Sequence, residues 1–536
     1  MPLPLRRVRI PALVTFGRPF SSRRLLLALV ALIATSIAGW SIVTNLTLVA
    51  TLHQPAGHHL DQADLLMLVQ NGRFGEAFEM AVAAGDKLFE TDFNALDGGG
   101  ANVGAGQRYT RIPRADLAGP TEWAHHSPSR ATGPNASACI GCHNKPVQDG
   151  AGGVEADVHR DPLHSGNLAT MIHRNTPHMF GLGGLQRLAE EMTADLQGLR
   201  DGAVQQVCSS GSPVTVVLQT KGVAFGSLVV TPNGSQPCVP QMDTSGVQGV
   251  DADLVVRPFQ WKGSVASLRD FVRGACHNEI GMQPVELVGV GVDADFDGVA
   301  DEMTVGDQTA LTIYLASQPR PTSKTELDHL GLLDPPLTAA EKSSIRRGAG
   351  TFRDIGCTAC HVTALRVDDP NFHEPSLSPS FRDTLFPSGM DPVAFGVRPD
   401  FPVGFDITRD QPDNRMRDSS GNVTYRLGAF RADPQGRAVV ELLGDLKRHD
   451  MGPGLAEAID ETGSGSSVFM TENLWGVGST APYLHDGRAT TVTEAILEHG
   501  GEGAVSNTAF QGLPTSMQVD IVSYLESLVL FKLPAD

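Results

Sequence analysis

Two short strings in this chain place two cysteines three positions apart and a histidine directly after the second cysteine. This C-x-x-C-H pattern is typical of covalent c-type haem attachment. Two thiols at this spacing can reach both vinyl groups of one porphyrin, while the adjacent imidazole ligates the iron. The pattern therefore predicts two haem c groups. The residues are Cys139, Cys142 and His143 for the first (haem 1), and Cys357, Cys360 and His361 for the second (haem 2).

Two other interpretations of these strings account less well for the cysteines and the histidine together. A structural zinc site would need four clustered ligands of its own at each string. A redox C-x-x-C motif gives no reason for a histidine in the same place twice. Cys276 precedes His277 and resembles half of a third haem motif, but a buried free thiol is the simpler interpretation.

The composition favours a multidomain, loop-rich protein. The chain has 536 residues, 41% of them hydrophobic, with 58 Gly, 35 Pro and only 6% aromatic residues. Much irregular structure suits c-type cytochromes, in which the porphyrin supplies a large part of the apolar core. The formal net charge of −19 argues against nucleic acid and is compatible with a small, basic electron-donor protein as partner.

The N-terminal residues 1–50 predict an export signal or a membrane anchor. Six arginines precede an apolar stretch at 25–43, which is about long enough to span a bilayer, although Ser36-Ile37-Ala38 also offers a cleavage site. Either alternative places the mature chain in the periplasm. In that oxidising compartment Cys208 and Cys238, which flank a predicted hairpin at 214–218 and 227–231, could form a disulfide.

A weak internal repeat suggests two similar units. Gly85 and Phe89 precede the first haem motif within a predicted amphipathic helix, and Gly348 and Phe352 do the same before the second. The fold class predicted is mainly α-helical, with two cytochrome c-like domains, long irregular loops and a small β insertion. The predicted boundaries are 51–316 for the domain of haem 1, 317–340 for a linker and 341–536 for the domain of haem 2.

An acidic run at 293–302 (DADFDGVADE) is a candidate calcium site. Acidic residues at alternate positions followed by Gly surround one point with oxygens, as in the first half of an EF-hand loop. The candidate ligands are Asp293, Asp295 and Asp297. The twelfth position carries Thr304 rather than Glu, so Asp301 or Glu302 would have to complete the site. The alternative is a solvated acidic turn.

Longer motifs resemble a known family. The run at 474–488 (LWGVGSTAPYLHDGR) is similar to the C-terminal signature of bacterial di-haem cytochrome c peroxidases. The segments 174–177 (RNTP), 261–263 (WKG), 278–281 (NEIG) and 449–453 (HDMGP) resemble the di-haem oxidoreductase branch, whose members are described as peroxidases or thiol oxidoreductases. The resemblance extends from about Ala84 to the C-terminus.

The resemblance implies different roles for the two haems. Haem 1 would be the catalytic group and haem 2 the entry point for electrons. The family's methionine ligand of the second iron falls at His499 in this chain. A second imidazole would favour ferric iron and lower the reduction potential. The alternative is that His499 caps the end of a helix before Gly500.

The resemblance also assigns the surroundings of haem 1. Trp261 corresponds to the family's tryptophan between the haems, an electron relay, and Glu279 corresponds to its distal acid. A pocket carboxylate can move a proton between the two oxygens of a peroxide while their bond breaks. The family's distal glutamine falls at Phe271. Alternatively, a histidine could occupy the remaining coordination position of the haem 1 iron and so prevent peroxide from binding. Three histidines follow the first motif closely enough for this: His159, His164 and His173.

The predicted function is a periplasmic di-haem oxidoreductase that reduces peroxide. Electrons would enter at haem 2 from a small soluble donor protein or a quinol-linked donor, and cross by Trp261 to haem 1. One alternative is haem-dependent oxidation or oxygenation of an organic or protein substrate. Another is a non-enzymatic electron carrier in which both irons are six-coordinate.

Overall fold

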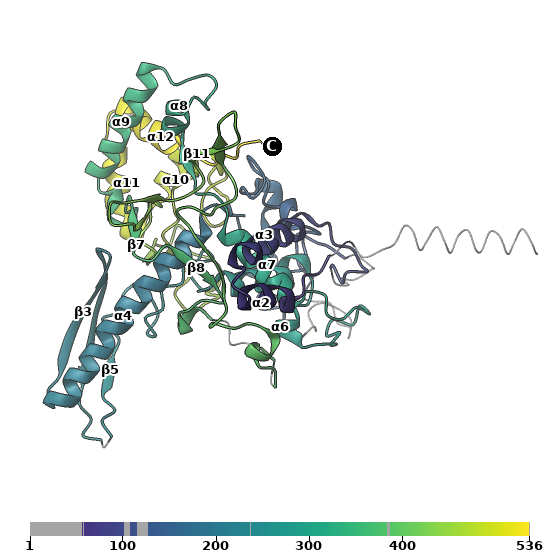
Figure 1. The fold of residues 1–536 in the computed structure, drawn as a ribbon. Coiled ribbons are helices and arrows are strands. Elements are labelled where there is room, and N and C mark those ends of the chain that lie inside the picture. Colours follow the sequence, from purple (N-terminus) through teal and green to yellow (C-terminus); the bar gives the residue numbers. More distant parts are fainter. Residues whose placement is uncertain are drawn as a thin grey trace, which may run out of the picture. The chain divides into compact units, whose positions relative to one another are not determined.

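The computed structural model describes residues 58–100, 108–114, 127–235, 237–382 and 389–534, together with residues 56, 386 and 387. The segment at 25–43, predicted to be a signal or an anchor, lies outside these residues. Residues Pro55–Asp536 form one compact unit (Figure 1). Among the described residues, no helix combines the length and the apolar character that a membrane crossing requires.

Two helices cross at a glycine in the first half of the unit. Helix α3 (Phe74–Glu90) packs on α7 (Val305–Ala316), a helix buried on all sides. A Cβ atom at Gly85 would lie 2.3 Å from the carbonyl oxygen of Ala310, so only glycine allows this close approach. Helices α2 (Gln62–Gln70), α5 (Leu268–Ala275) and α6 (Val285–Val288) lie nearby in this half.

The same arrangement occurs in the second half. Helix α9 (Ala339–Asp354) packs on α12 (Thr515–Leu525), and a Cβ atom at Gly348 would lie 1.9 Å from the carbonyl oxygen of Asp520. A capping box at Thr338 and Glu341 fixes the start of α9. The remaining helices here are α8 (Lys324–His329), α10 (Val492–Leu497) and α11 (Ala504–Gln511). The repeat predicted from Gly85 and Gly348 thus corresponds to two equivalent helix crossings.

The prediction of a mainly α-helical chain is wrong. In the described part of the chain, sixteen strands form seven small sheets alongside the helices, which makes the unit a mixture of α and β structure. Most of these strands have two to four residues, too few to show an alternating pattern in the sequence. Stretches that the sequence presents as irregular loops therefore pair into short ladders.

The shorter ladders are all antiparallel two- or three-stranded pieces. Their strands are β1 (Val158–Arg160), β2 (Ile172–Arg174), β6 (Thr322–Ser323), β7 (Leu365–Val367), β8 (Asn371–Glu374), β9 (Val403–Asp406), β10 (Arg415–Arg417), β11 (Val423–Arg426), β12 (Arg431–Ala432), β13 (Ala438–Val440), β14 (Arg448–Asp450), β15 (Val468–Met470) and β16 (Leu528–Val529). The pairs are β1 with β2, β8 with β9, β10 with β11, β14 with β15 and β16 with β6, while β12, β13 and β7 form one sheet in that order.

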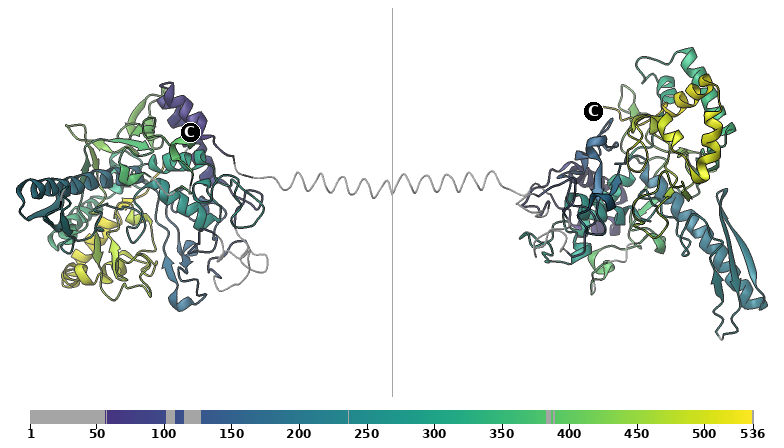
Figure 2. Two further views of the ribbon diagram at one scale, coloured as in Figure 1. Left: turned by 90° about the horizontal axis from the view of Figure 1, so that it is seen from below. Right: turned by 180° about the vertical axis from the view of Figure 1, so that it is seen from behind.

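A long arm extends from the unit (Figures 1 and 2). It consists of the C-terminal part of α4 (Leu182–Ser210) and a sheet of β3 (Val214–Thr220), β4 (Val223–Thr231) and β5 (Gln241–Asp243). The hairpin of β3 and β4 confirms the one predicted from the sequence. The disulfide between Cys208 and Cys238 is also confirmed, and it joins the end of α4 to the segment before β5.

Residues near the end of the described chain return to the first half. Strand β16 pairs with β6 in the segment between the two halves. Three residues later, Lys532 Nζ lies 2.6 Å from Oδ2 of the fully buried Asp149, whose Oδ1 accepts a hydrogen bond from Tyr314 at 2.8 Å. Segments far apart in the sequence are therefore joined beside the first haem motif.

The crossing of α9 and α12 leads to a testable expectation. The variant Gly348→Ala should lose about 1–3 kcal/mol of unfolding free energy, because its methyl group would overlap the Asp520 carbonyl oxygen. Gly350→Ala in the same helix is the control, since its Cβ atom would have its nearest contact at 3.9 Å, with Arg353. Urea unfolding followed by circular dichroism measures both. Equal midpoints for the two variants would contradict the close-packing explanation.

Candidate functional site

The first C-x-x-C-H string lines a partly open cavity, here called the first cavity. A 3₁₀ turn at Cys139–Gly141 brings Cys139, Cys142 and His143 to its wall. The Nδ1 atom of His143 donates a hydrogen bond to the carbonyl oxygen of Pro177 at 2.9 Å. This bond fixes the tautomer in which Nε2 carries a free lone pair. Burial lowers the pKa of His143 to about 4, so the imidazole is neutral and ready to ligate a metal.

The second string lines a second cavity in the same way. The 3₁₀ turn is Cys357–Ala359, and Cys357, Cys360 and His361 all border the cavity. Nδ1 of His361 donates to the carbonyl oxygen of Leu443 at 3.1 Å, and burial lowers the pKa of this histidine to about 4. Both strings therefore present two thiols and one neutral imidazole to a cavity, and these are the groups that could attach a haem c and ligate its iron.

An aromatic pair supports each of these histidines. The ring centres of Phe89 and His143 are 6.1 Å apart, and those of Phe352 and His361 are 6.2 Å apart. Behind each phenylalanine lies a tyrosine ring, Tyr314 at 5.6 Å in the first case and Tyr524 at 5.7 Å in the second. Each cavity has a volume of about 230 Å³. The two sites are local copies of one arrangement.

His499 lies across the second cavity from His361. The centres of the two rings are 6.4 Å apart. Half of that separation is close to a metal–imidazole bond of about 2.0–2.1 Å plus roughly 1 Å from the bonding nitrogen to the ring centre. Nδ1 of His499 donates to the Ala495 carbonyl oxygen at 2.8 Å. The histidine thus caps the end of α10 through Nδ1 and still offers Nε2 to a metal, so the two readings of its sequence position are compatible.

Glu279 lies in a π-helical turn, Cys276–Ile280, and borders the first cavity. Its side chain accepts a hydrogen bond from Asn135, and burial raises its pKa, although Asn135 and the positive charge of Arg160 act in the opposite direction. A raised pKa makes a carboxyl group a better proton acceptor than an ordinary carboxylate. Phe271 borders the same cavity.

Two polar residues of the first cavity were not singled out from the sequence. Asn135 precedes the first motif by four positions, and Arg160 lies in β1, where its guanidinium pairs with Glu461. Both border the cavity. The partners are separated by 144 residues for Asn135 and Glu279 and by 301 residues for Arg160 and Glu461. No local pattern in the sequence reports contacts of this range.

Trp261 lies in the wall between the cavities. Both cavities are bordered by Trp261 and by the run of Asn175, Thr176 and Pro177. The indole Nε1 donates a hydrogen bond to the carbonyl oxygen of Asn175 at 3.0 Å. The same short run therefore holds the indole and, through Pro177, the first histidine. Trp261, which the sequence resemblance predicts to be a relay, thus borders both cavities, and its relay role stays a prediction.

The described residues that line the first cavity do not include His159, His164 or His173, the three histidines that follow the first motif. His159 and His173 pair with each other, with ring centres 4.0 Å apart, and His164 Nε2 donates to the carbonyl oxygen of Arg130 at 2.7 Å. They are therefore not placed to close an iron at His143.

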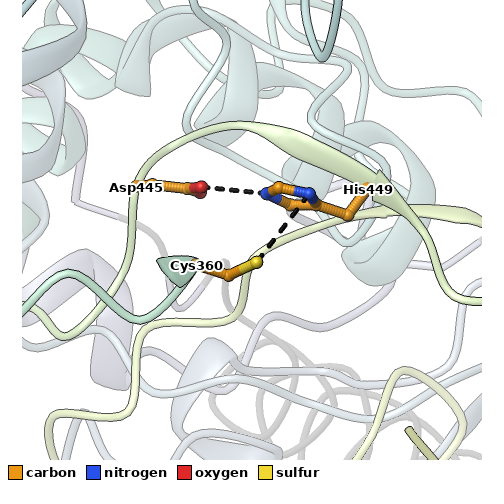
Figure 3. A group of neighbouring side chains, drawn as sticks. All are labelled: Cys360, Asp445 and His449. Atoms are coloured by element: carbon orange, nitrogen blue, oxygen red, sulfur yellow. Dashed lines mark hydrogen bonds and ion pairs between the residues drawn. The ribbon is translucent and has the colours of Figure 1, made fainter. Parts of the chain in front are cut away.

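His449, from the HDMGP segment, lies beside Cys360 at the second cavity (Figure 3). Its Nε2 lies 2.9 Å from Asp445 and its Nδ1 lies 2.8 Å from Glu502, while the sulfur of Cys360 is 3.9 Å from Nδ1. Burial disfavours the charged imidazole, but the hydrogen bonds with Asp445, Cys360 and Glu502 outweigh it and raise the pKa of His449 to about 10.

The acidic run is separate from both cavities. Carboxylate oxygens of Asp293, Asp295 and Asp297 lie within 4.8 Å of one another. Asp301 is not in this group, and its Oδ1 accepts a hydrogen bond from the Gly291 amide at 2.6 Å.

Comparison with known proteins supports the resemblance seen in the sequence. Residues 434–528 match the family described as "Di-haem oxidoreductase, putative peroxidase". The resemblance is confirmed for this segment, which contains His449 and His499 and covers part of the second cavity. A structure of Kuenenia stuttgartiensis hydrazine synthase, pressurised with 20 bar of xenon, shares 18% identity with a TM-score of 0.20, over 43% of this chain and 57% of that chain. The chain thus spans a little over half of that protein's length. No match was found among curated proteins.

Proposed function

We propose that this chain is a periplasmic di-haem c-type oxidoreductase that reduces peroxide. The observation that carries the proposal is the asymmetry of two otherwise equivalent cavities that share a wall. The second cavity offers two facing imidazoles, from His361 and His499, whereas the first offers one imidazole and a pocket acid, Glu279. A six-coordinate iron transfers electrons and an open one can bind a small molecule, so the asymmetry supports a division of labour.

The thiols and imidazoles of each string would hold the cofactor. Cys139 and Cys142 would form the thioether bonds of haem 1, and Cys357 and Cys360 those of haem 2. When bound, a haem iron with one free position supplies the electron transfer that peroxide reduction requires. The disulfide between Cys208 and Cys238 supports an oxidising compartment, where a small soluble donor protein or a quinol-linked donor would deliver the electrons.

The residues around the first cavity would transfer protons to and from the peroxide. Hydrogen peroxide, two electrons and two protons give two molecules of water. Glu279 can take a proton from one peroxide oxygen and return it to the other, because burial raises its pKa. Asn135 holds the carboxyl group in place, and the guanidinium of Arg160 favours negative charge that develops on the departing oxygen.

Haem stoichiometry tests the cofactor assignment. The double variant Cys139→Ala/Cys142→Ala, produced in a host that attaches haem c, should retain one covalent haem per chain instead of two. Cys276→Ala is the control, because this thiol borders the first cavity but belongs to neither string. The pyridine haemochrome assay of denatured protein measures the ratio. Two covalent haems in the double variant would contradict attachment at this string.

The proposed proton transfer predicts a specific loss. Glu279→Gln should lower peroxide turnover roughly 10²- to 10⁴-fold with both haems still attached, since the amide cannot accept the proton. Glu79→Gln, an exposed position on α3, should leave turnover unchanged. Stopped-flow consumption of hydrogen peroxide is the measurement. If wild type and Glu279→Gln turn over equally, Glu279 is not the proton carrier; if wild type reduces no peroxide at all, the proposed activity is wrong.

The ligand role of His499 has a spectroscopic consequence. His499→Ala should convert haem 2 from a low-spin to a high-spin ferric state, because the second imidazole is removed while His361 remains. Electron paramagnetic resonance of the oxidised protein distinguishes the two states. His329→Ala, at an exposed histidine of α8, is the control and should keep the wild-type spectrum. An unaltered low-spin signal in His499→Ala would remove His499 from the coordination sphere.

A further inference from the structure

The acidic run before α7 forms a compact group of carboxylates outside both cavities. Asp293, Asp295 and Asp297 each contribute an oxygen to a cluster in which these atoms lie within 4.8 Å of one another. Close carboxylates repel one another unless positive charge lies between or beside them. The cluster therefore needs positively charged groups nearby.

Two oxygens in this region are buried without a hydrogen-bond partner. Asp295 is 1% exposed and Glu302 is 2% exposed. Oδ1 of Asp295 and Oε1 of Glu302 have no partner within the described residues, although the second oxygen of each does. A buried carboxylate oxygen without a partner is costly, and a bound cation is a common remedy.

Glu302 is connected to the cluster through Gln283. The Gln283 amide donates to Oε2 of Glu302 at 2.7 Å, and its side-chain oxygen accepts from the Ala294 amide at 2.8 Å. The buried, unpartnered Oε1 of Glu302 therefore belongs to a side chain that is held next to the acidic run.

The protein's own cations balance only part of the charge. Within the described part of the chain, Arg130 pairs with Asp295 at 3.3 Å and Arg108 pairs with Asp297 at 2.8 Å. The three carboxyl groups of the cluster thus face two guanidinium groups, which leaves net negative charge for a cation to balance. A set of carboxylate oxygens selects a hard ion such as Ca²⁺.

The same arginine reaches the segment that carries Glu279. Nη2 of Arg130, which is fully buried, donates to the carbonyl oxygen of Gly281 at 3.0 Å. Gly281 directly follows the π-helical turn Cys276–Ile280. The segment after Arg130 continues the contact, since Thr132 Oγ1 donates to the carbonyl oxygen of Asn278 at 2.8 Å and the Asn135 amide donates to that of Glu279 at 2.8 Å.

We propose that Asp293, Asp295 and Asp297 bind one Ca²⁺ ion, with Glu302 beside it, and that Arg130 makes the position of the Glu279 turn depend on this ion. Nη2 of Arg130 contacts Asp295 and the Gly281 carbonyl oxygen at the same time, so a change of charge at the carboxylates acts through this guanidinium on the end of the turn. The binding site stands independently, whereas its effect on turnover rests on the proposed function of Glu279.

Direct binding tests the site. Haem-loaded protein, from which Ca²⁺ has been removed with a chelator, is titrated with CaCl₂ by isothermal titration calorimetry. The variants Asp293→Asn and Asp295→Asn are titrated in the same way. Each variant should bind one Ca²⁺ fewer per chain or bind it at least tenfold more weakly. In Asp293→Asn the single side-chain oxygen can replace only one of the two carboxylate oxygens that accept from the Asp297 and Gly298 amides, so circular dichroism is used to check that the variant is folded.

Asp418→Asn is the matched control. Asp418 lies in an exposed turn and also accepts hydrogen bonds from backbone amides, those of Ser420 and Asn422. The Asp418→Asn variant should bind Ca²⁺ with the stoichiometry and affinity of the wild type. Unchanged Ca²⁺ stoichiometry and affinity in folded Asp293→Asn and Asp295→Asn would overturn the site.

Hydrogen–deuterium exchange tests the coupling. Removing Ca²⁺ from wild type should increase exchange in peptides that cover residues 276–283, with no change in the arm at 214–231. Equal exchange with and without the ion would overturn the coupling. Peroxide turnover is measured on the same samples: if Ca²⁺ binds and protects the turn but no peroxide is reduced, the cation site stands and the proposed activity fails.

Discussion

One kind of hydrogen bond sets the chemistry of both cavities: a backbone carbonyl oxygen accepts from Nδ1 of a buried histidine. Pro177 does this for His143, Leu443 for His361 and Ala495 for His499. In each case the ring cannot rotate without losing the bond, and the other nitrogen is left without a proton. The backbone thus decides which atoms can meet a metal before any cofactor arrives, and burial keeps the rings neutral.

The first of these carbonyls belongs to a short segment that connects the two halves. The carbonyl oxygen of Asn175 accepts a hydrogen bond from the indole N–H of Trp261. The side-chain amide of Asn175 donates to the carbonyl oxygen of Pro482, 307 residues away. Pro177 holds His143. A shift of the run at 482–485 would therefore move the tryptophan and the first imidazole together. The same backbone segment thus sets the position of the wall between the two cavities.

The sequence predicted what depends on short spacing. Two thiols and a histidine within five positions, a glycine at a helix crossing and a cysteine on each side of a hairpin are all local patterns, and the structure shows the hairpin, the disulfide and the two crossings. Contacts across long separations were missed, as with Asn135 at Glu279 and Glu502 at His449. The β content was missed because strands such as β12 and β16 have two residues each and no periodicity.

The return of residues 528–532 to the first half has a consequence for biogenesis. The buried carboxylate of Asp149, six residues after His143, is neutralised by Lys532, which is synthesised 383 residues later. Until Lys532 has been synthesised and has docked, this buried carboxylate lacks its counter-ion, which carries a free-energy cost. The segment that follows the first C-x-x-C-H string therefore completes its packing only after residues 528–532 have been added to the growing chain.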